Sequence, residues 1–210
     1  MFKNKVGTIE ELRTYYAQPG KVSLQKQRQT LDQNSREFIA QSSFVLIATA
    51  DSAGRCDVSP KGDKPGFVRV LDETHLIIPD RPGNNRLDSL TNLIENPGIG
   101  LLFLIPGRGD TLRVNGKAWI VTDKELLEML SVEGKPPKTV IGVEASEVYL
   151  HCPKAFMRSG LWEPNSWPTE TKIPTMCEML WAQLPEKPAG VNDVKEYEAA
   201  MQERLEKTLY

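Results

Sequence analysis

The chain has 210 residues, of which 40% are hydrophobic and 26% are charged. This composition is typical of a soluble globular protein, and the length suits one domain with extensions. The net charge of −2 gives no electrostatic reason to expect a nucleic-acid or membrane partner. The first residues lack the apolar core of a signal peptide, and no apolar run approaches the roughly 20 residues that span a bilayer. We therefore expect a cytoplasmic protein.

Cysteines and histidines are few. Cys56, Cys152 and Cys177 are widely spaced and odd in number, which predicts neither a disulfide framework nor a zinc knuckle. Only His75 and His151 are available as imidazole ligands, and a metal site needs three or four clustered ligands, so we predict no metal site. The neighbours His151 and Cys152 suggest a catalytic thiol, but no second histidine is placed to act as its base.

Residues 1–42 are predicted to form a helical extension that serves packing. Thr8 and Glu11 have the spacing of a capping box for a first short helix. Further along, Leu31 and Phe38 belong to a narrow apolar stripe, which indicates a second helix lying on a core.

Short β segments follow this extension. The predicted strands cover residues 44–50, a hairpin return arm from residue 55, and residues 67–71, 75–79, 98–105, 110–122 and 139–150. The stretch 56–66 is too rich in Pro and Gly for a central strand, and the apolar run 98–105 predicts burial on both faces. Short antiparallel strands threaded by short helices favour a barrel or sandwich over a doubly wound sheet. The predicted class is mainly β with peripheral helices (α+β).

The strand 110–122 alternates in polarity. Thr111, Arg113 and Trp119 lie on one side, opposite an apolar side that faces the core. The polar side is either solvent-facing sheet or a wall that faces a ligand. Thr122 and Glu125 then predict a capping box for the next short helix.

One stretch, residues 77–89, joins a strand to a helix. Asn84 or Asn85 is a natural helix N-cap, which would place Arg81 and Arg86 beside the helix start. A helix start presents unpaired N–H groups and a partial positive charge, which favour phosphate. Two guanidinium groups add bidentate donors. The stretch is therefore predicted to be a phosphate clamp.

A plainer interpretation of these arginines stays open. In it, the turn is exposed, and its arginines are solvated or paired with Asp80 and Asp88. Arg69 also allows two interpretations. In the first, it lies on an apolar strand face, where a buried charge needs a partner. The alternative is an arginine on the barrel exterior that is simply paired.

The region after the strands is predicted to be helical. Residues 154–162 form a short helical piece in which Arg158 and Trp162 cover a pocket or a subunit contact. Residues 169–210 are predicted to be a second helical extension, with an apolar helix near 173–184 followed by an amphipathic one. Neither of these two helices carries a chemical motif, and the second is expected to pack on its own barrel or on a neighbour.

Five segments in this order resemble the pyridoxamine 5′-phosphate oxidase-like flavoproteins, and more narrowly a bacterial subgroup of FMN-dependent proteins. They are SPKGD (59–63), GFVRVLD (66–72), LIIPDRPGNNRLDSL (76–90), IENPGIGLLFLIPG (94–107) and TLRVNGKA (111–118). The resemblance covers about residues 40–165, and RPGNNRLDSL followed by ENP is its most specific part. It implies an FMN-binding split β-barrel over residues 43–168, and a homodimer that holds FMN at the subunit interface.

By this likeness ten residues are expected to contact FMN. They are Arg81, Asn84, Asn85 and Arg86 around the phosphate, Arg69 as a further positive group, Ser59 and Lys61 alongside the flavin, Thr111 at its pyrimidine edge from the partner subunit, and Arg158 and Trp162 closing over the site. The carboxy-terminal arginine and histidine signature of a true pyridoxamine phosphate oxidase is absent, so pyridoxal phosphate synthesis is not expected.

Two functions follow as hypotheses. The first is an FMN-dependent oxidoreductase with a small-molecule substrate and NADPH or NADH as candidate electron donor; no catalytic side chain is assigned, since the flavin carries the redox chemistry. The second is a non-catalytic flavin- or haem-binding protein, acting as sensor, carrier or store, with His75 or His151 as haem ligand. A deazaflavin in place of FMN, and a barrel without any cofactor, remain further alternatives.

Overall fold

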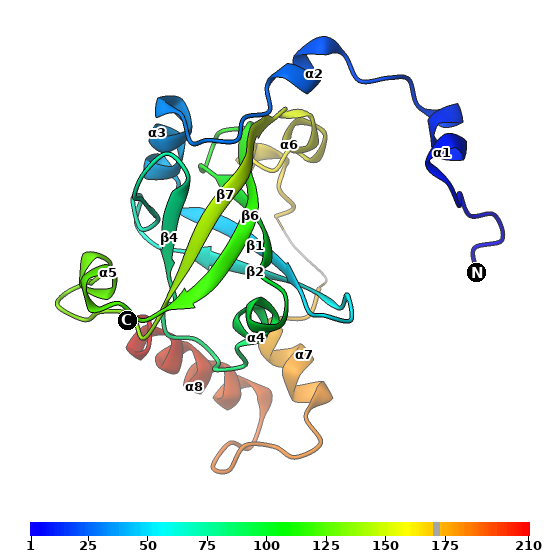
Figure 1. The fold of residues 1–210 in the computed structure, drawn as a ribbon. Coiled ribbons are helices and arrows are strands. Elements are labelled where there is room, and N and C mark those ends of the chain that lie inside the picture. Colours follow the sequence, from blue (N-terminus) through cyan, green and yellow to red (C-terminus); the bar gives the residue numbers. More distant parts are fainter. Residues whose placement is uncertain (170–172) are drawn as a thin grey trace.

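The computed structural model describes residues 1–169 and 173–210, and its centre is a seven-stranded sheet in the order β2-β1-β5-β6-β7-β4-β3. The strands are β1 (Phe44–Ala50), β2 (Cys56–Gly62), β3 (Arg69–Val70), β4 (His75–Pro79), β5 (Gly98–Leu104), β6 (Thr111–Val121) and β7 (Val140–His151). Every neighbouring pair is antiparallel. In Figure 1, β1 and β2 cross behind β6 and β7 at a steep angle, so the sheet curls over its own core. The predicted class is confirmed in its architecture (α+β): an antiparallel seven-stranded sheet forms a split β-barrel, and the helices are peripheral to it.

The core lies inside this curled sheet. Alternate residues of the strands point into it, as the two-residue period of a strand requires, and the large side chains among them include Ile47, Leu76, Leu101 and Phe103. The helix α3 (Gln33–Gln41) contributes Phe38 and Ile39 to the same cluster, together with Leu31 just before it. The apolar stripe predicted for this helix is therefore confirmed.

The structure agrees with one of three strand predictions, shortens the second strand and contradicts the third prediction. The stretch after residue 55 forms β2, which lies at one edge of the sheet, as its proline requires. The strand predicted over residues 67–71 is only two residues long, Arg69–Val70, at the other edge. Burial of β5 on both faces is wrong, because only Ile99, Leu101 and Phe103 are fully buried in it. An antiparallel sheet can leave one face partly open, and an apolar run does not reveal this.

A bulge interrupts the pairing of β6 with β7. Asn115 lies opposite Glu147 and Gly116 opposite Ala145, so Ser146 is the extra residue in β7. At Gly116 a Cβ atom would lie 2.0 Å from the carbonyl oxygen of Glu144. Only glycine permits this approach of the two strands.

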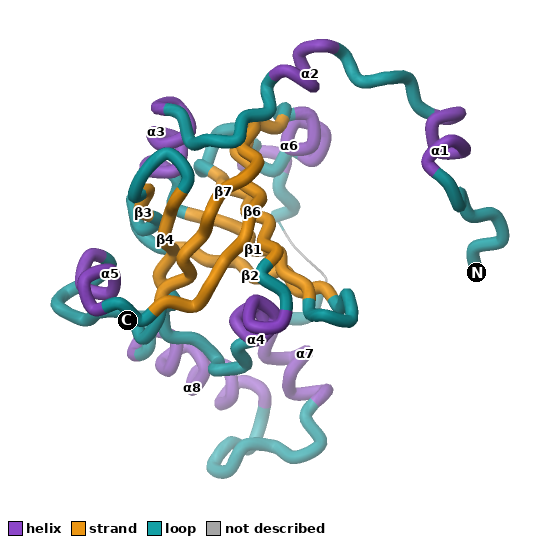
Figure 2. The backbone as a smooth tube through the Cα atoms, viewed as in Figure 1, coloured by secondary structure: helices purple, strands orange, loops and turns teal. Residues whose placement is uncertain are grey.

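The remaining helices surround the barrel (Figure 2). They are α4 (Asp88–Glu95), α5 (Lys124–Met129), α6 (Lys154–Ser159), the 3-10 turn Pro164–Ser166, α7 (Met176–Gln183) and α8 (Val194–Lys207). The capping box predicted at Thr122 and Glu125 is wrong, because α5 begins after Asp123 and has no side-chain cap. Residues 170–172, which belong to the predicted second extension, lie outside the described residues. Within residues 1–169 and 173–210, no helix is both long and apolar enough to cross a membrane.

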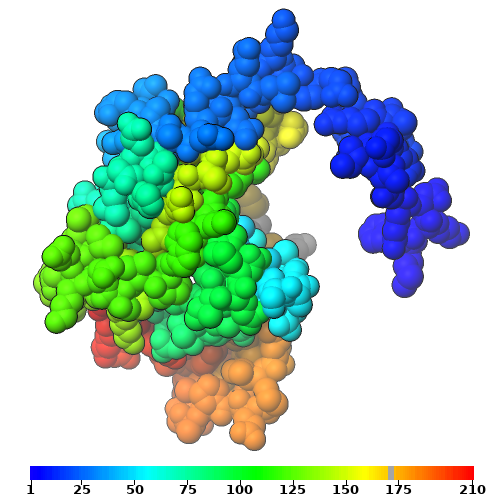
Figure 3. Space-filling model, viewed as in Figure 1, coloured from blue at the N-terminus to red at the C-terminus, as the bar shows by residue number. Residues whose placement is uncertain are grey.

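The first part of the chain forms an arm that leaves the barrel (Figure 3). Its helices α1 (Ile9–Tyr15) and α2 (Lys21–Gln25) contain no buried residue. Thr8 caps α1 by accepting from the Glu11 amide, but the predicted capping box is incomplete, because the Glu11 carboxylate accepts from the Gly7 amide instead of the Thr8 amide. The arm joins the barrel where Arg28 pairs with Val148 of β7.

Candidate functional site

The loop between β4 and α4 has an unusual backbone. Asn85 (φ 58°) and Leu87 (φ 61°) both lie in the left-handed region, and Leu87 is the N-cap of α4. The predicted cap at Asn84 or Asn85 is wrong: the Asn84 side-chain oxygen instead accepts from the Arg86 amide at 3.0 Å and stabilises the turn. No side chain caps the start of α4. Its first N–H groups are therefore available to an anion.

A partly buried polar cluster fixes the start of α4 against β2. The Ser89 hydroxyl donates to Asp57 Oδ2 at 2.5 Å and lies 2.9 Å from the Ser59 hydroxyl. Ser59 donates to the same Asp57 oxygen at 3.1 Å. Because these bonds link the helix to a strand, they position the uncapped helix end relative to the barrel.

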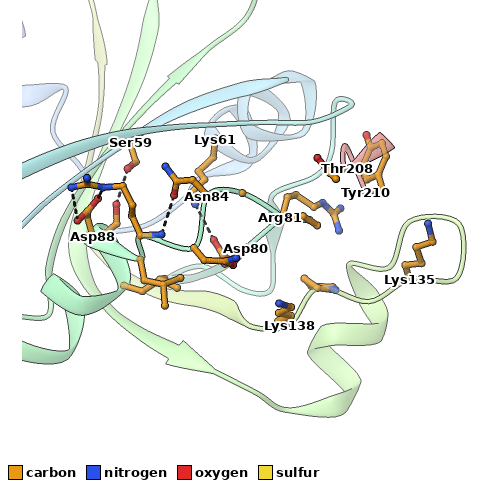
Figure 4. A pocket seen from close by; sticks show the side chains of 18 of the residues that line it. Ser59, Lys61, Asp80, Arg81, Asn84, Asp88, Lys135, Lys138, Thr208 and Tyr210 are labelled. Carbon is orange, nitrogen blue, oxygen red and sulfur yellow. Dashed lines mark hydrogen bonds and ion pairs between the residues drawn. The ribbon is translucent and has the colours of Figure 1, made fainter. Parts of the chain in front are cut away.

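A cavity of about 580 Å³ lies beside this helix start. It is bounded by the end of β2, by the loop 80–87, by residues 135–138 and by the end of α8 (Figure 4). Two carboxylates line it, Asp80 and Asp88. Six cationic side chains line it: Lys61, Arg81, Arg86, Lys135, Lys138 and Arg204. Although the whole chain has a net charge of −2, the cavity is therefore strongly positive.

Arg81 is held by a buried partner. Its Nε donates to Asp63 Oδ2 at 2.8 Å, and its Nη1 donates to the Leu130 carbonyl at 2.9 Å. The side chains of Arg81 and Asp63 are 16% and 4% exposed. Burial acts to raise the pKa of Asp63, but hydrogen bonds from Tyr210, the Lys64 amide and Arg81 outweigh burial, so this pKa lies below its usual value. Asp63 is therefore a carboxylate at neutral pH.

The other two cations at the loop have looser partners. Lys61 Nζ lies 2.9 Å from Asp80 Oδ1, and Arg86 Nε lies 2.8 Å from Asp88 Oδ2 with both side chains exposed. Arg86 thus pairs with Asp88, one of the two partners named for it in the plainer interpretation, whereas Arg81 pairs with Asp63 instead of Asp80. In Figure 4, Arg81 lies near Thr208 and Tyr210, while Asp88 lies toward Ser59 at the other side of the view. The two arginines therefore occupy separate parts of the cavity.

The structure gathers six of the ten predicted residues, Ser59, Lys61, Arg81, Asn84, Asn85 and Arg86, at this cavity. The other four lie elsewhere within one copy of the chain. Arg69 is exposed on the edge strand β3, Thr111 is buried at the start of β6, and Arg158 is exposed on α6. Trp162 stacks on Phe156 with ring centroids 5.8 Å apart. The contacts predicted between these ten residues and FMN stay predictions.

Sequence reasoning missed several contributors to the cavity. Asp63 stands inside the SPKGD segment, where a carboxylate beside a lysine was a usable signal. Arg204, Thr208 and Tyr210 follow no motif. They reach the cavity only because α8 packs back toward the barrel.

The two histidines lie outside the cavity. His75 is exposed, and its Nδ1 is 2.9 Å from Asp72 Oδ2. Burial, followed by the charges of Arg113 and Lys26, lowers the pKa of His151. Among the described residues, no group of three or more His, Cys, Asp and Glu side chains is arranged to hold a metal ion.

The fold and the cavity define a split β-barrel protein with a cationic cavity at the start of α4. The family model described as "Pyridoxamine 5'-phosphate oxidase" matches residues 31–152, which is more than half of the chain. This chain belongs to that family. A search of curated proteins found no match.

Solved structures with a similar fold include three bacterial proteins. HupZ from Group A Streptococcus is 21% identical, with 56% of this chain and 90% of that chain covered and a TM-score of 0.46. The General Stress Protein 26 from Bacillus anthracis str. Sterne is 16% identical, with 55% and 89% covered and a TM-score of 0.42. An FMN-binding protein from Syntrophomonas wolfei subsp. wolfei is 13% identical, with 70% and 98% covered and a TM-score of 0.42.

Proposed function

We propose that this chain is an FMN-binding flavoprotein that works as an oxidoreductase on a small molecule. The observation that carries the proposal is the cavity, which is lined by six cationic side chains and two carboxylates and lies beside a helix start without a side-chain cap. A phosphate group satisfies such a site, because it accepts from helix N–H groups and from cations together. Membership of the pyridoxamine 5'-phosphate oxidase family supports FMN as the phosphate-bearing ligand.

The chain's own residues have separable roles in holding that ligand. Arg86 and Lys61 line the cavity close to the α4 start and are proposed to bind the phosphate. Arg81 uses two of its five N–H donors on Asp63 and Leu130. Its other donors can serve the ligand. When bound, the flavin supplies the redox chemistry, and the protein supplies binding and orientation.

The proposed assembly is a homodimer with a shared flavin site. Thr111, Arg158 and Trp162 are expected to contact FMN, yet none of them lines the cavity of its own chain. A site completed by a second copy accounts for this separation of Arg158 and Trp162, which are not fully buried in one copy, whereas Thr111 is buried there. The reductant proposed is NADPH or NADH, and the substrate is a small molecule. Neither His75 nor His151 lines the cavity, so no observation favours the haem-binding alternative.

The test is a titration of the purified protein with FMN, read by flavin fluorescence. Arg86→Ala should raise the Kd for FMN about tenfold, because a hydrogen bond to a charged group contributes roughly 1.5–3 kcal/mol. The matched control is Arg108→Ala, since Arg108 also pairs with the aspartate two residues on, Asp110, but lies outside the cavity. Unchanged affinity in Arg86→Ala would contradict the phosphate site.

A second measurement separates an enzyme from a binder. NADPH or NADH added without oxygen should bleach the visible absorption of the bound flavin, and a small electron acceptor should restore it. Absence of reduction by either donor would favour the non-catalytic flavin-binding alternative. Mass spectrometry of the ligand released from freshly purified protein distinguishes FMN from a deazaflavin.

A further inference from the structure

The segment that ends α8 forms one wall of the cavity. Arg204, Thr208 and Tyr210 all line it. The Tyr210 hydroxyl donates to Asp63 Oδ1 at 2.8 Å, although the two residues are 147 positions apart in the chain. Figure 4 shows Thr208 and Tyr210 beside Arg81. The wall is therefore connected to the cation site by a specific hydrogen bond.

Asp63 connects Tyr210 to Arg81. Its two carboxylate oxygens are divided between them: Oδ1 accepts from Tyr210, and Oδ2 accepts from Arg81 Nε. The Lys64 amide also donates to Oδ1, at 2.7 Å. Since the Asp63 side chain is only 4% exposed, water has little access to replace these donors. Hydrogen bonds to both carboxylate oxygens therefore fix the orientation of the Asp63 carboxylate.

The position of the carboxylate sets the plane of the guanidinium. An arginine side chain is a rigid planar fork, so bonds from Nε to Asp63 and from Nη1 to the Leu130 carbonyl fix the direction of its remaining N–H groups. The Tyr210 ring also lies over the guanidinium, with Arg81 Cζ 5.9 Å from the ring centroid. Tyr210 therefore acts on Arg81 through its hydroxyl and through its ring.

We propose that Tyr210 is a positioning residue of the anion site, which orients Arg81 toward the bound phosphate through Asp63. This inference rests on the proposed function, because it concerns the same cavity. It makes the end of α8 part of the binding site. A phosphate-bearing ligand should then be sensitive to Tyr210, whereas a ligand without phosphate should not be.

The experiment compares FMN with riboflavin, which lacks the phosphate, in fluorescence titrations of the full chain. Tyr210→Phe removes only the hydroxyl and keeps the ring. It should weaken FMN binding about fivefold, the effect of one hydrogen bond, and leave riboflavin binding unchanged. The matched control is Tyr197→Phe on α8, whose ring packs on Trp181 away from the cavity lining, and it should change neither affinity.

A second variant tests whether the effect passes through Arg81. Arg81→Lys keeps a positive charge opposite Asp63 but lacks the planar fork. In that background Tyr210→Phe should have no further effect on FMN affinity. Thermal unfolding of each variant without ligand checks that the fold is retained. If riboflavin binds too weakly to titrate, the comparison of Tyr210→Phe in the wild-type and Arg81→Lys backgrounds decides alone.

Each result of these titrations either supports or overturns the proposed role of Tyr210. Equal wild-type affinities for FMN and riboflavin would remove the phosphate site, and with it both the proposed function and this inference. A wild-type preference for FMN that Tyr210→Phe fully retains would overturn the role of Tyr210 alone. An equal loss for both ligands or an undiminished effect in the Arg81→Lys background would show a structural role and also overturn the inference.

Discussion

Arg81 and Asp63 form an ion pair that is almost fully enclosed, with side chains 16% and 4% exposed and 2.8 Å between Nε and Oδ2. The neighbouring pair of Arg86 and Asp88 has the same distance, but its side chains are 72% and 46% exposed. A buried charge that loses its partner is costly, whereas an exposed pair contributes little to stability. The two arginines of the cavity should therefore respond differently to replacement.

Arg81→Ala should destabilise the fold. It leaves the buried Asp63 carboxylate without its ionic partner, so the free energy of unfolding should fall by about 3 kcal/mol. Arg86→Ala should change it by less than about 0.5 kcal/mol. Urea unfolding followed by tryptophan fluorescence measures both. Equal stabilities of the two variants would contradict the enclosed pair, and the expected difference makes Arg86 the better residue for binding assays.

The stability that Asp63 contributes should depend on pH. Its pKa lies below the usual value in the folded protein. A carboxyl with a lowered folded-state pKa contributes stability that is fully present above its unfolded pKa of about 3.9, and that is lost as the pH falls through the folded pKa. Asp63→Asn should therefore be much less stable than wild type at pH 7, and the difference should shrink below about pH 4.

Urea unfolding at several pH values measures this difference. The control is Asp123→Asn, at an exposed carboxylate that makes no capping bond to α5, and its difference from wild type should stay near zero at every pH. If Asp63→Asn and wild type differed in free energy of unfolding by the same amount at pH 3 and pH 7, the lowered pKa would be contradicted.

Much of the fold could be predicted because it depends on local patterns. The hairpin after Ala50, the alternation along β6 and the apolar stripe of α3 follow from side-chain periodicity, and each is present in the structure. The start of α4 could not be predicted in the same way. Asparagine is a common N-cap, but here Asn84 stabilises the turn and Leu87 takes the cap position with a left-handed backbone. The surroundings impose that conformation, and residue type does not reveal it.

Local sequence predicted only the part of the candidate site whose residues are close together in the chain, and Ser59 and Lys61 were expected from the family resemblance alone. Arg81, Asn84, Asn85 and Arg86 lie within one short loop and line one cavity. The bond from Tyr210 to Asp63 spans 147 positions, and it depends on how α8 returns to the barrel. Neither composition nor periodicity contains that information.

Gly116→Ala should disrupt the pairing of β6 with β7. The added Cβ would lie 2.0 Å from the Glu144 carbonyl oxygen, which is backbone and cannot turn aside. We expect a loss of roughly 3 kcal/mol or more, or failure to fold. Gly100→Ala, in the neighbouring strand β5, is the control: its Cβ would meet only the Asn115 side chain at 3.4 Å and Ala48 at 3.7 Å. Thermal unfolding compares the two, and comparable midpoints would contradict the close approach at the bulge.

Removing residues 2–24 should weaken dimer formation without lowering the stability of the barrel. The arm exposes large apolar side chains, among them Phe2, Ile9, Tyr15 and Val22, and neither α1 nor α2 buries a residue against its own barrel. A second copy of the chain, as in the proposed homodimer, is the partner we expect to cover these side chains.

The shortened chain keeps the attachment of the arm, because Lys26 still reaches the Leu150 carbonyl and Arg28 still pairs with Val148. Its thermal unfolding, measured at a concentration where both chains are monomeric, should match the full chain, since no core contact is lost. Sedimentation over a range of concentrations should show a weaker dimer. Replacing Phe2, Ile9 and Val22 by serine in the full-length chain should weaken the dimer in the same way, because these substitutions remove apolar surface without changing the length. Dimerisation equal to that of the full chain in both variants would mean that the arm does not contact the second copy.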